Sequence, residues 1–494
     1  MNFSDMITKI QERELKSVEN LVDFSINKLT CDSREVELND IFFAIKGLKQ
    51  DGNNYITEAL GRGAMAVFTD SVVAHPDPRI YKVEDCRKMM AIISNEYYGY
   101  PSLKMKITGI TGTNGKTTVS SIINHVLKKC GKKTGLIGTT GNYIDNRYIK
   151  SIYTTPETIT LFRLLKEMAD EGVEYVTMEV SSHSLALKRV YGIEFDVAVF
   201  TNLTPEHLDF HGDMQSYFLA KKILFDGMKR INLKGNHTAV IYNCDDEYGS
   251  KIVQNAESER ISYGTGCGTY TAENIKMDFY GMEFDVLLPR NGTERITVKT
   301  RLTGKFNIHN ILASIAVLNY YNIPYGDIAA AVSEIDGVDG RFNVIKLAGG
   351  AYAIIDYAHT PDSLEKAILS VKEILAIKNS KCRLITVFGC GGDRDKSKRA
   401  VMGRIATSIS DLAIITSDNP RYEDPLDIIS DIIEGIRSDD YIIEPDREKA
   451  IVKAVEISRA GDVILIAGKG HEDYQEIRGE RVKFSDKEIV GRYV

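Results

Sequence analysis

The sequence predicts an α/β protein made of three domains. At 494 residues the chain is too long for one hydrophobic core, because domains are typically ~150 residues long. Two stretches, residues 105–242 and residues 351–467, alternate apolar strand-like segments with helix-like segments, which is typical of mostly parallel sheets. The first of them opens with a strand, a glycine-rich loop and a helix in direct succession.

The composition is ordinary for a globular protein and points to neither a nucleic-acid nor a membrane partner. Hydrophobic residues make up 43% of the chain and charged residues 27%. The 62 basic and 69 acidic residues give a net charge of −7, so nothing global favours nucleic acid or an anionic membrane. No run approaches the ~20 apolar residues of a membrane span, and the charged N-terminus lacks an apolar signal segment. We therefore expect a cytoplasmic protein. A monomer is also expected, although nothing in the composition bears on the oligomeric state.

The cysteines agree with that compartment. There are seven of them, an odd number, and none forms a Cys-x-x-Cys pair. This usage favours a reduced cytoplasmic environment and argues against structural zinc.

The N-terminal region is expected to form a small domain of short elements. Residues 40–45 and 64–69 are strand-like, and residues 55–63 between them are helix-like. The triplet Asp32-Ser33-Arg34 places a hydroxyl and a guanidinium beside glycine-rich turns, an arrangement that could hold a diphosphate or a sugar. For the triplet alone, a solvated loop is the simpler interpretation.

Residues 107–118 have the layout of a phosphate-binding loop. Glycines let backbone N–H groups approach phosphates, Lys116 adds a point charge at a helix N-terminus, and the Thr117 hydroxyl can reach Mg²⁺. The usual Walker spacing requires glycine where Ile110 stands. The stretch Gly112-Thr-Asn-Gly-Lys-Thr-Thr118 therefore fits a shorter P-loop variant, and makes the central domain a P-loop ATPase with a mostly parallel sheet.

The rest of the central domain continues the alternation. We expect helices at residues 117–129, 158–170 and 214–229, and strands at residues 134–137, 174–180, 196–201 and 238–242. Residues 270–302 alternate with period two, which predicts an antiparallel ribbon with a hairpin turn at residues 290–292.

The last third predicts a Rossmann-like doubly wound domain whose strand ends carry ligands. Strands are expected at residues 351–356, 383–388, 411–416 and 462–467, and helices at residues 363–376, 398–408, 425–436 and 447–458. The run Gly389-Cys-Gly-Gly-Asp393 lacks a full dinucleotide fingerprint, so NAD is not expected.

Polar residues cluster after the expected strands. Glu179, His183, His207 and His211 follow two neighbouring strands, and a carboxylate with an imidazole can complete a Mg²⁺ site with nucleotide oxygens. Lys221 lies on a helix, where spacing alone predicts a surface lysine. In the last domain, Arg394, Arg421 and Glu472 follow three strands, and arginine forks with a carboxylate form a plausible clamp for a zwitterion.

Together these motifs resemble the Mur ligase family over nearly the whole chain. The matching elements are Asp32-Ser33-Arg34, Gly112 to Thr118, Thr154-Thr155-Pro156, Glu179 to His183, Thr201 to His207, Ala220-Lys221, Asn307 to Asn310, Gly340-Arg341, Asp356 to His359, Gly391 to Arg394, Asp418 to Arg421 and Gly468 to Glu472. The resemblance implies a precursor-binding domain at residues 1–103, an ATP-binding domain at residues 104–339 and an amino-acid-binding domain at residues 340–494. It also implies that ATP phosphorylates the D-Glu carboxylate of UDP-N-acetylmuramoyl-L-Ala-D-Glu, and that an amino-acid amine attacks the acyl phosphate.

The resemblance also implies residue roles. Lys116, Lys221, His207 and Glu179 would be catalytic, and Thr117, Glu179, His207 and a carbamylated Lys221 would hold Mg²⁺. ATP would contact Gly112, Thr113, Asn114, Gly115, Lys116, Thr117, Thr118, Asn310, Arg341 and Asp356. The UDP precursor would contact Ser33, Thr154, Thr155, Ser181 and Arg189, and the amino acid would contact Arg394, Asp418, Asn419, Pro420, Arg421, Gly468 and Glu472. The sequence departs from the pattern at Leu187, where related enzymes often carry a glutamine that contacts the precursor.

The identity of the amino acid depends on Arg421. Relatives that use meso-diaminopimelate carry Asp-Asn-Pro-Arg, as residues 418–421 do here, whereas lysine-adding relatives generally lack the arginine. Diaminopimelate has a second carboxylate for an arginine fork and lysine has none, so we expect diaminopimelate, with lysine as the alternative. A folylpolyglutamate synthetase-like ligase is a remote alternative that does not explain residues 418–421 and 468–472. A nucleotide-dependent switch protein is the alternative from a different class of function. It would need no clamp for a second substrate, so Arg394, Arg421 and Glu472 argue against it.

Overall fold

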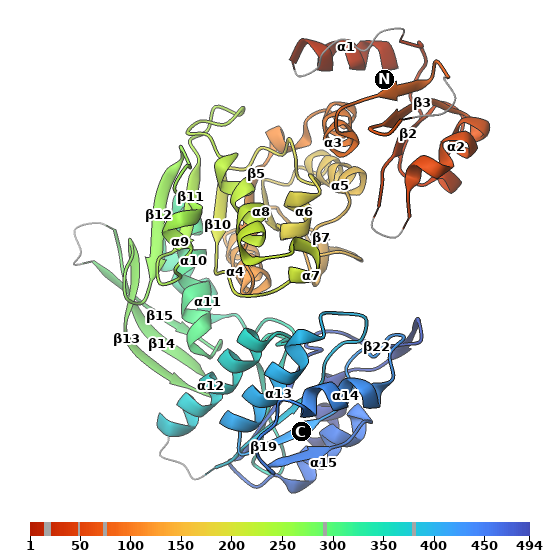
Figure 1. Ribbon diagram of the computed structural model, residues 1–494. Coiled ribbons are helices and arrows are strands. Elements are labelled where there is room, and N and C mark those ends of the chain that lie inside the picture. The colour runs from red at the N-terminus through yellow and green to blue at the C-terminus, as the bar shows by residue number, and fades with distance from the viewer. Residues whose placement is uncertain (14–20, 48–49, 73–76, 290–293, 378–381) are drawn as a thin grey trace.

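The computed structural model describes residues 1–13, 21–47, 50–72, 77–289, 294–377 and 382–494. Three sheets form the cores of three domains, and Figure 1 shows the central domain between a small N-terminal domain and a C-terminal domain. This confirms the three-domain α/β architecture. The hairpin turn expected at residues 290–292 lies outside the described residues.

The N-terminal domain is a small parallel sheet covered by helices. Its four strands pair in the order β1-β2-β3-β4, and rings of Phe3, Phe43, Phe68 and Tyr81 pack together in its core. The strand and helix segments expected from residue 40 to residue 69 are confirmed. The elements are α1 (Phe3–Arg13), β1 (Leu29–Thr30), β2 (Asp40–Ala44), α2 (Ile56–Arg62), β3 (Ala64–Thr69), β4 (Ile80–Lys82) and α3 (Cys86–Tyr97).

The central domain has an eleven-stranded sheet in the order β15-β14-β13-β12-β11-β10-β5-β9-β6-β7-β8. The strands from β12 to β6 are parallel, and antiparallel pairs extend both edges. The ribbon expected at residues 270–302 is one of these extensions. The strands are β5 (Lys106–Thr111), β6 (Thr134–Gly138), β7 (Gly141–Ile144), β8 (Arg147–Ile149), β9 (Tyr175–Glu179), β10 (Val197–Phe200), β11 (Ala239–Asn243), β12 (Glu259–Gly264), β13 (Tyr270–Asp278), β14 (Gly281–Leu287) and β15 (Arg295–Thr300).

Helices cover both faces of this sheet because its parallel strands are apolar on both sides. Successive residues of β10 point to opposite cores: Val197 packs with α4 and α10, and Ala198 packs with α5 and α8. Helix α10, which periodicity did not reveal, is apolar around most of its circumference and buried accordingly. The helices are α4 (Lys116–Lys129), α5 (Thr158–Asp170), α6 (Ser182–Ala186), α7 (Leu208–His211), α8 (Met214–Asp226), α9 (Gly249–Ile252), α10 (Lys305–Tyr320) and α11 (Tyr325–Ser333).

The C-terminal domain is doubly wound, as predicted. Its sheet runs β16-β17-β21-β18-β19-β20, with only β16 antiparallel, and a hairpin of β22 and β23 is appended. The strands are β16 (Asn343–Lys346), β17 (Tyr352–Asp356), β18 (Leu384–Phe388), β19 (Leu412–Ile415), β20 (Tyr441–Ile443), β21 (Val463–Ala467), β22 (Tyr474–Ile477) and β23 (Glu480–Lys483). The helices are α12 (Pro361–Ile377), α13 (Ser397–Ile409), α14 (Pro425–Ile433), α15 (Arg447–Ile457) and α16 (Asp486–Val490).

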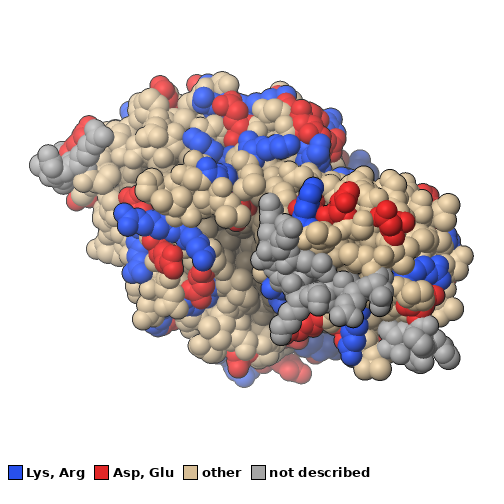
Figure 2. Space-filling model, turned by 90° about the horizontal axis from the view of Figure 1, so that it is seen from above, with Lys and Arg blue, Asp and Glu red and all other residues tan. Residues whose placement is uncertain are grey.

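Acidic and basic side chains are interspersed on the face seen in Figure 2 rather than gathered into a region of one sign. Among the described residues, no helix is long and apolar enough to cross a membrane.

Candidate active site between the central and C-terminal domains

The phosphate-binding loop joins β5 to α4 and requires glycine at two positions. Gly112 and Gly115 have φ angles of +148° and +89°. A Cβ atom at Gly112 would lie 1.9 Å from the Thr201 hydroxyl, and one at Gly115 would lie 2.5 Å from the Asn310 amide oxygen. Ile110 is buried in the core as part of β5. The departure from Walker spacing thus falls in a strand, and the loop begins at Gly112.

Lys116 lies across this loop. Its ammonium donates hydrogen bonds to the carbonyl oxygens of Gly112 and Thr113, at 2.9 and 2.7 Å. Desolvation lowers the pKa of Lys116, although Glu206 and Glu179 act in the opposite direction. The loop therefore holds its lysine close to the backbone that forms the cradle.

Glu179, at the end of β9, is fixed to the start of α4. Its Oε2 atom accepts a hydrogen bond from the Thr117 hydroxyl at 3.1 Å. The backbone N–H and the hydroxyl of Thr139 donate to its two oxygens, at 2.9 and 3.1 Å. A carboxylate and a hydroxyl thus converge beside the cradle, and both are oxygen ligands that Mg²⁺ accepts.

His207 follows β10 in a left-handed backbone conformation, with φ of +57°. Its ring packs edge-to-face against the His183 ring, with ring centroids 4.7 Å apart. Burial is the main cause that lowers the pKa of each ring to about 4. Both imidazoles are therefore neutral near pH 7, the state in which a histidine can ligate a metal.

Glu206 belongs to the same cluster, and sequence reasoning did not single it out. Its carboxylate lies 3.7 Å from the His207 Nε2 atom and 3.4 Å from the Nε2 atom of His359, which belongs to the C-terminal domain. Burial would raise the pKa of Glu206, but the contacts with His359, His207 and Lys116 hold it well below the usual range. The only available signal was its place beside His207 in the Thr-Pro-Glu-His segment.

Lys221 on α8 is not a surface residue, which corrects the expectation from helix spacing. Its side chain is only 2% exposed, and its ammonium donates to the Gly112 carbonyl at 2.9 Å and lies 4.5 Å from the Tyr217 ring centre. Burial, followed by repulsion from Lys116, moves the pKa of Lys221 far below its ordinary value. The neighbouring Lys222 pairs with Asp226 instead. Spacing could not distinguish the two lysines, which are adjacent on α8 and both buried.

The residues expected at the precursor form a continuous network on the central domain, except Ser33. The Thr155 hydroxyl donates to the Glu179 carbonyl at 2.8 Å and accepts from the Ser181 N–H at 3.1 Å. Arg189 donates to the Thr155 carbonyl at 3.1 Å, and the Thr154 hydroxyl accepts from Thr139 at 3.1 Å. These contacts tie the network to Glu179.

Ser33 lies across the domain boundary, in the N-terminal domain. It is buried and donates to Glu58 at 3.2 Å. Two residues earlier, the pKa of the Cys31 thiol is raised. Burial is the main cause, and the nearby carboxylate of Glu157 in the central domain is the second. Leu187 caps α6, and its N–H donates to the His183 carbonyl at 2.8 Å. The position that departs from the family pattern therefore has a backbone role next to the site.

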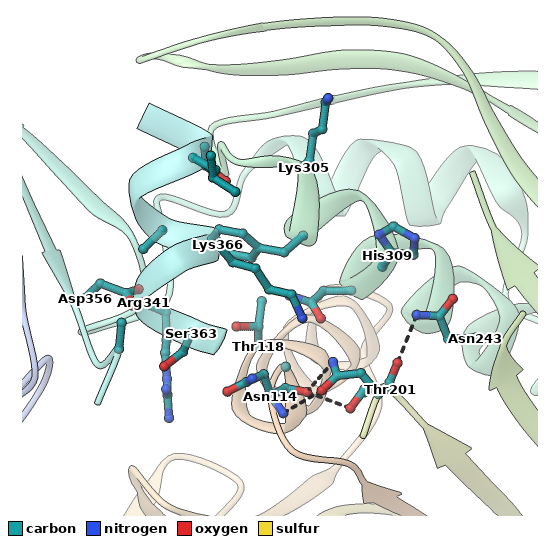
Figure 3. A pocket seen from close by; sticks show the side chains of 18 of the residues that line it. Asn114, Thr118, Thr201, Asn243, Lys305, His309, Arg341, Asp356, Ser363 and Lys366 are labelled. Carbon is teal, nitrogen blue, oxygen red and sulfur yellow. Dashed lines mark hydrogen bonds between the residues drawn. The ribbon is translucent and has the colours of Figure 1, made fainter. Parts of the chain in front are cut away.

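A first cavity, of about 420 Å³, lies beside the cradle between the two domains. Figure 3 shows Asn114 and Thr118 from the cradle facing Arg341, Asp356 and Ser363 from the C-terminal domain. Asn310 also lines the cavity, and so do Asn243, Asp245, Tyr263, Lys305 and His309, which sequence reasoning missed. Asp356 accepts a hydrogen bond from the Phe342 N–H at 2.6 Å, and its burial raises its pKa.

A second cavity, of about 950 Å³, brings the expected clusters of the two domains together. From the central domain it is lined by His183, Glu206 and His207, and from the C-terminal domain by His359, Arg394, Asp418, Asn419, Arg421, Gly468 and Glu472. Pro420 contributes its backbone nearby: a Cβ atom at Gly392 would lie 1.9 Å from its carbonyl oxygen.

Arg394 and Arg421 both line this second cavity, and both lie close to Gly391. A Cβ atom at Gly391 would be 2.9 Å from Nη1 of Arg421 and 3.8 Å from Cγ of Arg394. Arg421 donates to the Gly392 carbonyl at 2.7 Å, and its Nε atom lies 3.3 Å from Glu476. Arg394 and Arg421 line the same cavity as Asp418 and Glu472, so the cavity carries both cationic and anionic groups, which suits a zwitterion.

One cysteine pair differs from the expectation of reduced thiols. Cys244 and Cys267 form a disulfide, with Cα atoms 6.1 Å apart. They are 23 residues apart in sequence and meet because β11 and β12 are neighbouring strands. With Asp245 they are, among the described residues, the one group of three His, Cys, Asp or Glu side chains whose ligating atoms all lie within 4.8 Å of one another, but the two sulfurs are bonded to each other. Asp245 lies 2.8 Å from His309, which also lines the first cavity.

Taken together, the glycine-rich cradle at the carboxyl end of a parallel sheet and the doubly wound domain facing it define a P-loop α/β protein with a second ligand cavity. Comparison with known families gives a more specific assignment. The Mur ligase family, catalytic domain, matches residues 25–98, the Mur ligase middle domain matches residues 110–318, and the Mur ligase, glutamate ligase domain, matches residues 340–470. The chain belongs to the Mur ligase family.

Individual relatives agree with this membership. The UDP-N-acetylmuramoyl-L-alanyl-D-glutamate–2,6-diaminopimelate ligase of Clostridium botulinum is 45% identical over 473 residues, which cover 94% of each chain. A solved structure of a ligase of that name matches with a TM-score of 0.69 and 29% identity, covering 98% of each chain. A Mycobacterium tuberculosis folylpolyglutamate synthase matches with a TM-score of 0.63 and 16% identity, covering 77% of this chain and 92% of its own, and so shares the fold.

Proposed function

We propose that this chain is an ATP-dependent ligase that joins meso-2,6-diaminopimelate to UDP-N-acetylmuramoyl-L-alanyl-D-glutamate, a cytoplasmic step of peptidoglycan precursor synthesis. The observation that carries the proposal is the second cavity, which is lined by Arg394 and Arg421 of the C-terminal domain and by His207 of the central domain. Relatives at 45% and 40% identity bear the name of this ligase.

ATP occupies the first cavity and the cradle in this proposal. Backbone groups of residues 112–118 and the Lys116 ammonium bind the phosphates. Asn310, Arg341 and Asp356 contact the nucleotide from the walls of that cavity. Arg341, which stacks on Tyr357 with the guanidinium carbon 4.6 Å from the ring centre, adds positive charge next to the phosphoryl group that is transferred.

The precursor lies along the network at Thr154, Thr155, Ser181 and Arg189, with its UDP part reaching Ser33 on the N-terminal domain. This network is hydrogen-bonded to the backbone of Glu179, so a precursor bound there ends near the cradle. Its D-Glu carboxylate attacks the γ-phosphorus of ATP, which forms an acyl phosphate and releases ADP.

Amide formation follows in the second cavity. The neutral amine of the amino acid attacks the acyl carbon, the bond from that carbon to the phosphate oxygen breaks, and the proton lost by the nitrogen passes to the departing phosphate. The contacts of Asn114 and Thr204 with Asp362, at 2.9 and 3.2 Å, hold the C-terminal domain against the cradle. Closure of the two domains over this cavity would exclude water, which would otherwise hydrolyse the acyl phosphate.

The residues at the cradle fit Mg²⁺. Thr117 and Glu179 provide adjoining oxygens, His207 is neutral because its pKa lies at about 4, and all three would hold the ion. Mg²⁺ would supply charge neutralisation for the phosphates. Lys221 fits carbamylation, because an amine must be neutral to add CO₂ and burial lowers the pKa of this one. The carbamate would replace an ammonium with a carboxylate-like group that joins the metal ligands.

Diaminopimelate is favoured over lysine by Arg394 and Arg421. These guanidinium groups bind the distal carboxylate in fork geometry, and the distal ammonium meets Asp418 and Glu472. Asn419, Pro420 and Gly468 complete the wall around that end. Lysine lacks the distal carboxylate, so it would form none of these charged hydrogen bonds with the two arginines.

The proposal includes the domain limits 1–103, 104–339 and 340–494. It also holds that the chain acts as a monomer, without nucleic acid or membrane. Sedimentation equilibrium of the active protein would test the monomer.

The test is phosphate release by purified protein with ATP, Mg²⁺ and the UDP-muramoyl dipeptide, with meso-diaminopimelate or lysine added separately. We expect release that depends on diaminopimelate. Release that no amino acid stimulates would refute the ligase function, and a preference for lysine would refute the argument from Arg421. The same assay is also run with glutamate and a folate acceptor. Phosphate release with that pair would favour a folylpolyglutamate synthetase-like reaction instead.

A further inference from the structure

Lys469 is a fully buried lysine directly behind the wall of the second cavity, between the lining residues Gly468 and Glu472. It follows β21 and is 0% exposed. A buried ammonium is costly unless it is paired and hydrogen-bonded, so its neighbours indicate what it stabilises. Those neighbours are residues of the proposed amino-acid site: the Lys469 Nζ atom lies 2.9 Å from Glu472, 3.1 Å from Asn419 and 3.6 Å from Asp418.

Lys469 and the backbone of Glu476 together orient the Asn419 amide. The Asn419 Oδ1 atom accepts from the Lys469 ammonium at 3.1 Å and from the Glu476 N–H at 2.9 Å. Both partners can only donate, so the oxygen must face them. The Asn419 NH₂ group is consequently directed at Glu472 Oε2, to which it donates at 2.8 Å.

The same lysine sets the charge of this wall. Glu472 Oε2 receives donors from both Lys469 and Asn419, so Oε1 is the oxygen left for a ligand. Asp418 Oδ1 is buried without a hydrogen-bond partner among the described residues. Within the group of Lys469, Asp418 and Glu472, one ammonium against two carboxylates leaves a net charge of about −1, enough to match one ammonium group. Nearby, Arg447 is already paired with Asp486 at 2.8 Å.

We propose that Lys469 is a positioning residue for the amino-acid substrate. It holds Asn419 and Glu472 in their binding orientation and leaves one uncompensated negative charge for the distal ammonium of a diamino acid. This inference rests on the proposed function, and it extends it, because Lys469 binds no substrate itself.

The test compares Lys469→Met with the wild type in the phosphate-release assay, varying each of the three substrates. We expect the KM for diaminopimelate to rise about tenfold or more, with the KM values for ATP and the UDP precursor within about twofold, as for the loss of one charged hydrogen bond. The matched control is Lys449→Met, in which an exposed lysine 3.7 Å from Asp446 in the same domain is changed; its KM values should all stay at the wild-type level.

The outcomes separate the inference from the function. A wild type without amino-acid-dependent release refutes the proposed function and this inference with it. An active wild type with an unchanged KM for diaminopimelate in Lys469→Met, or with equal increases for all three substrates, refutes the inference alone. If Lys469→Met does not fold, Lys469→Arg keeps the charge but not the ammonium geometry. A selective rise in the KM for diaminopimelate in that variant supports the inference, and unchanged KM values refute it.

Discussion

The Arg341 guanidinium donates a hydrogen bond to the Thr117 hydroxyl, with 3.0 Å between Nη2 and Oγ1. Arg341 belongs to the C-terminal domain and Thr117 opens the first helix after the cradle, so this contact joins the two domains at the phosphate site. The same hydroxyl donates to Glu179 at 3.1 Å. The Thr117 hydroxyl oxygen therefore links Arg341 and Glu179, and all three groups are ones that the phosphates and their counterion would contact.

Arg341→Met should weaken ATP binding. The variant removes a charged donor but keeps much of the side-chain volume, and charged hydrogen bonds contribute about 1.5–3 kcal/mol, roughly 10- to 150-fold in affinity. The KM for ATP, measured by phosphate release, should rise within that range. Arg301→Met is the control, because Arg301 is exposed and pairs with the exposed Asp336. An Arg341→Met enzyme with the KM for ATP of the wild type would contradict the placement of ATP.

Lys221→Ala should lower kcat by roughly 100-fold, the scale for removing one electrostatic group from an active site. If the active form is a carbamate, formate or acetate should partly restore kcat, because a small carboxylate can occupy the space that the side chain vacates. Lys222→Ala, which removes a lysine paired with Asp226, provides the control. Activity of Lys221→Ala close to the wild-type value would rule out the carbamate.

Arg421→Ala should weaken the use of diaminopimelate by about 1.5–3 kcal/mol, the value of a charged hydrogen bond. Its ability to use lysine should change much less, because lysine has no distal carboxylate. Both values of kcat/KM come from phosphate release with each amino acid. Arg437→Ala removes an exposed arginine of the same domain as a control. Equal losses for the two amino acids would mean that Arg421 does not contact the distal carboxylate.

Folding stability should decrease in mild acid. Burial lowers the pKa of His183 and His207 to about 4 in the folded chain, whereas an unfolded histidine has a pKa of about 6.5. Between these values the unfolded state binds more protons, so stability is full above about pH 6.5 and falls as the pH drops toward 4. Thermal unfolding at about pH 7.5 and about pH 5 should show a lower Tm in acid.

The difference in Tm between those two pH values should shrink in His183→Asn and remain in His237→Asn, which changes an exposed histidine. The same pH dependence in His183→Asn as in the wild type would show that this ring does not contribute.

Local sequence predicted the regular elements well because hydrophobic period and loop chemistry act over short distances. The helix expected at residues 158–170 is α5, and the strand expected at residues 64–69 is β3, with the same limits. Helix α10 escaped because apolar residues surround it, so that it shows no amphipathic period. Its partly polar start carries Asn310, whose proximity to Gly115 depends on tertiary packing.

The candidate site was predictable where strand ends converge and was not where burial decides. Arg394, Arg421 and Glu472 could be grouped because parallel strands place their carboxyl ends at one edge. The burial of Lys221, the contact of Glu206 with His359 and the disulfide between Cys244 and Cys267 depend on segments distant in sequence. No local pattern reports such pairings, and the resemblance to a family was the only guide to Lys221.

The central claim is that the cradle and the second cavity form one amide-forming site that operates through an acyl phosphate. The most direct measurement uses a UDP-muramoyl dipeptide labelled with ¹⁸O in the D-Glu side-chain carboxylate. With ATP, Mg²⁺ and diaminopimelate, one labelled oxygen should appear in the released phosphate, detected by mass spectrometry, as amide accumulates. Amide formation with unlabelled phosphate would contradict the account.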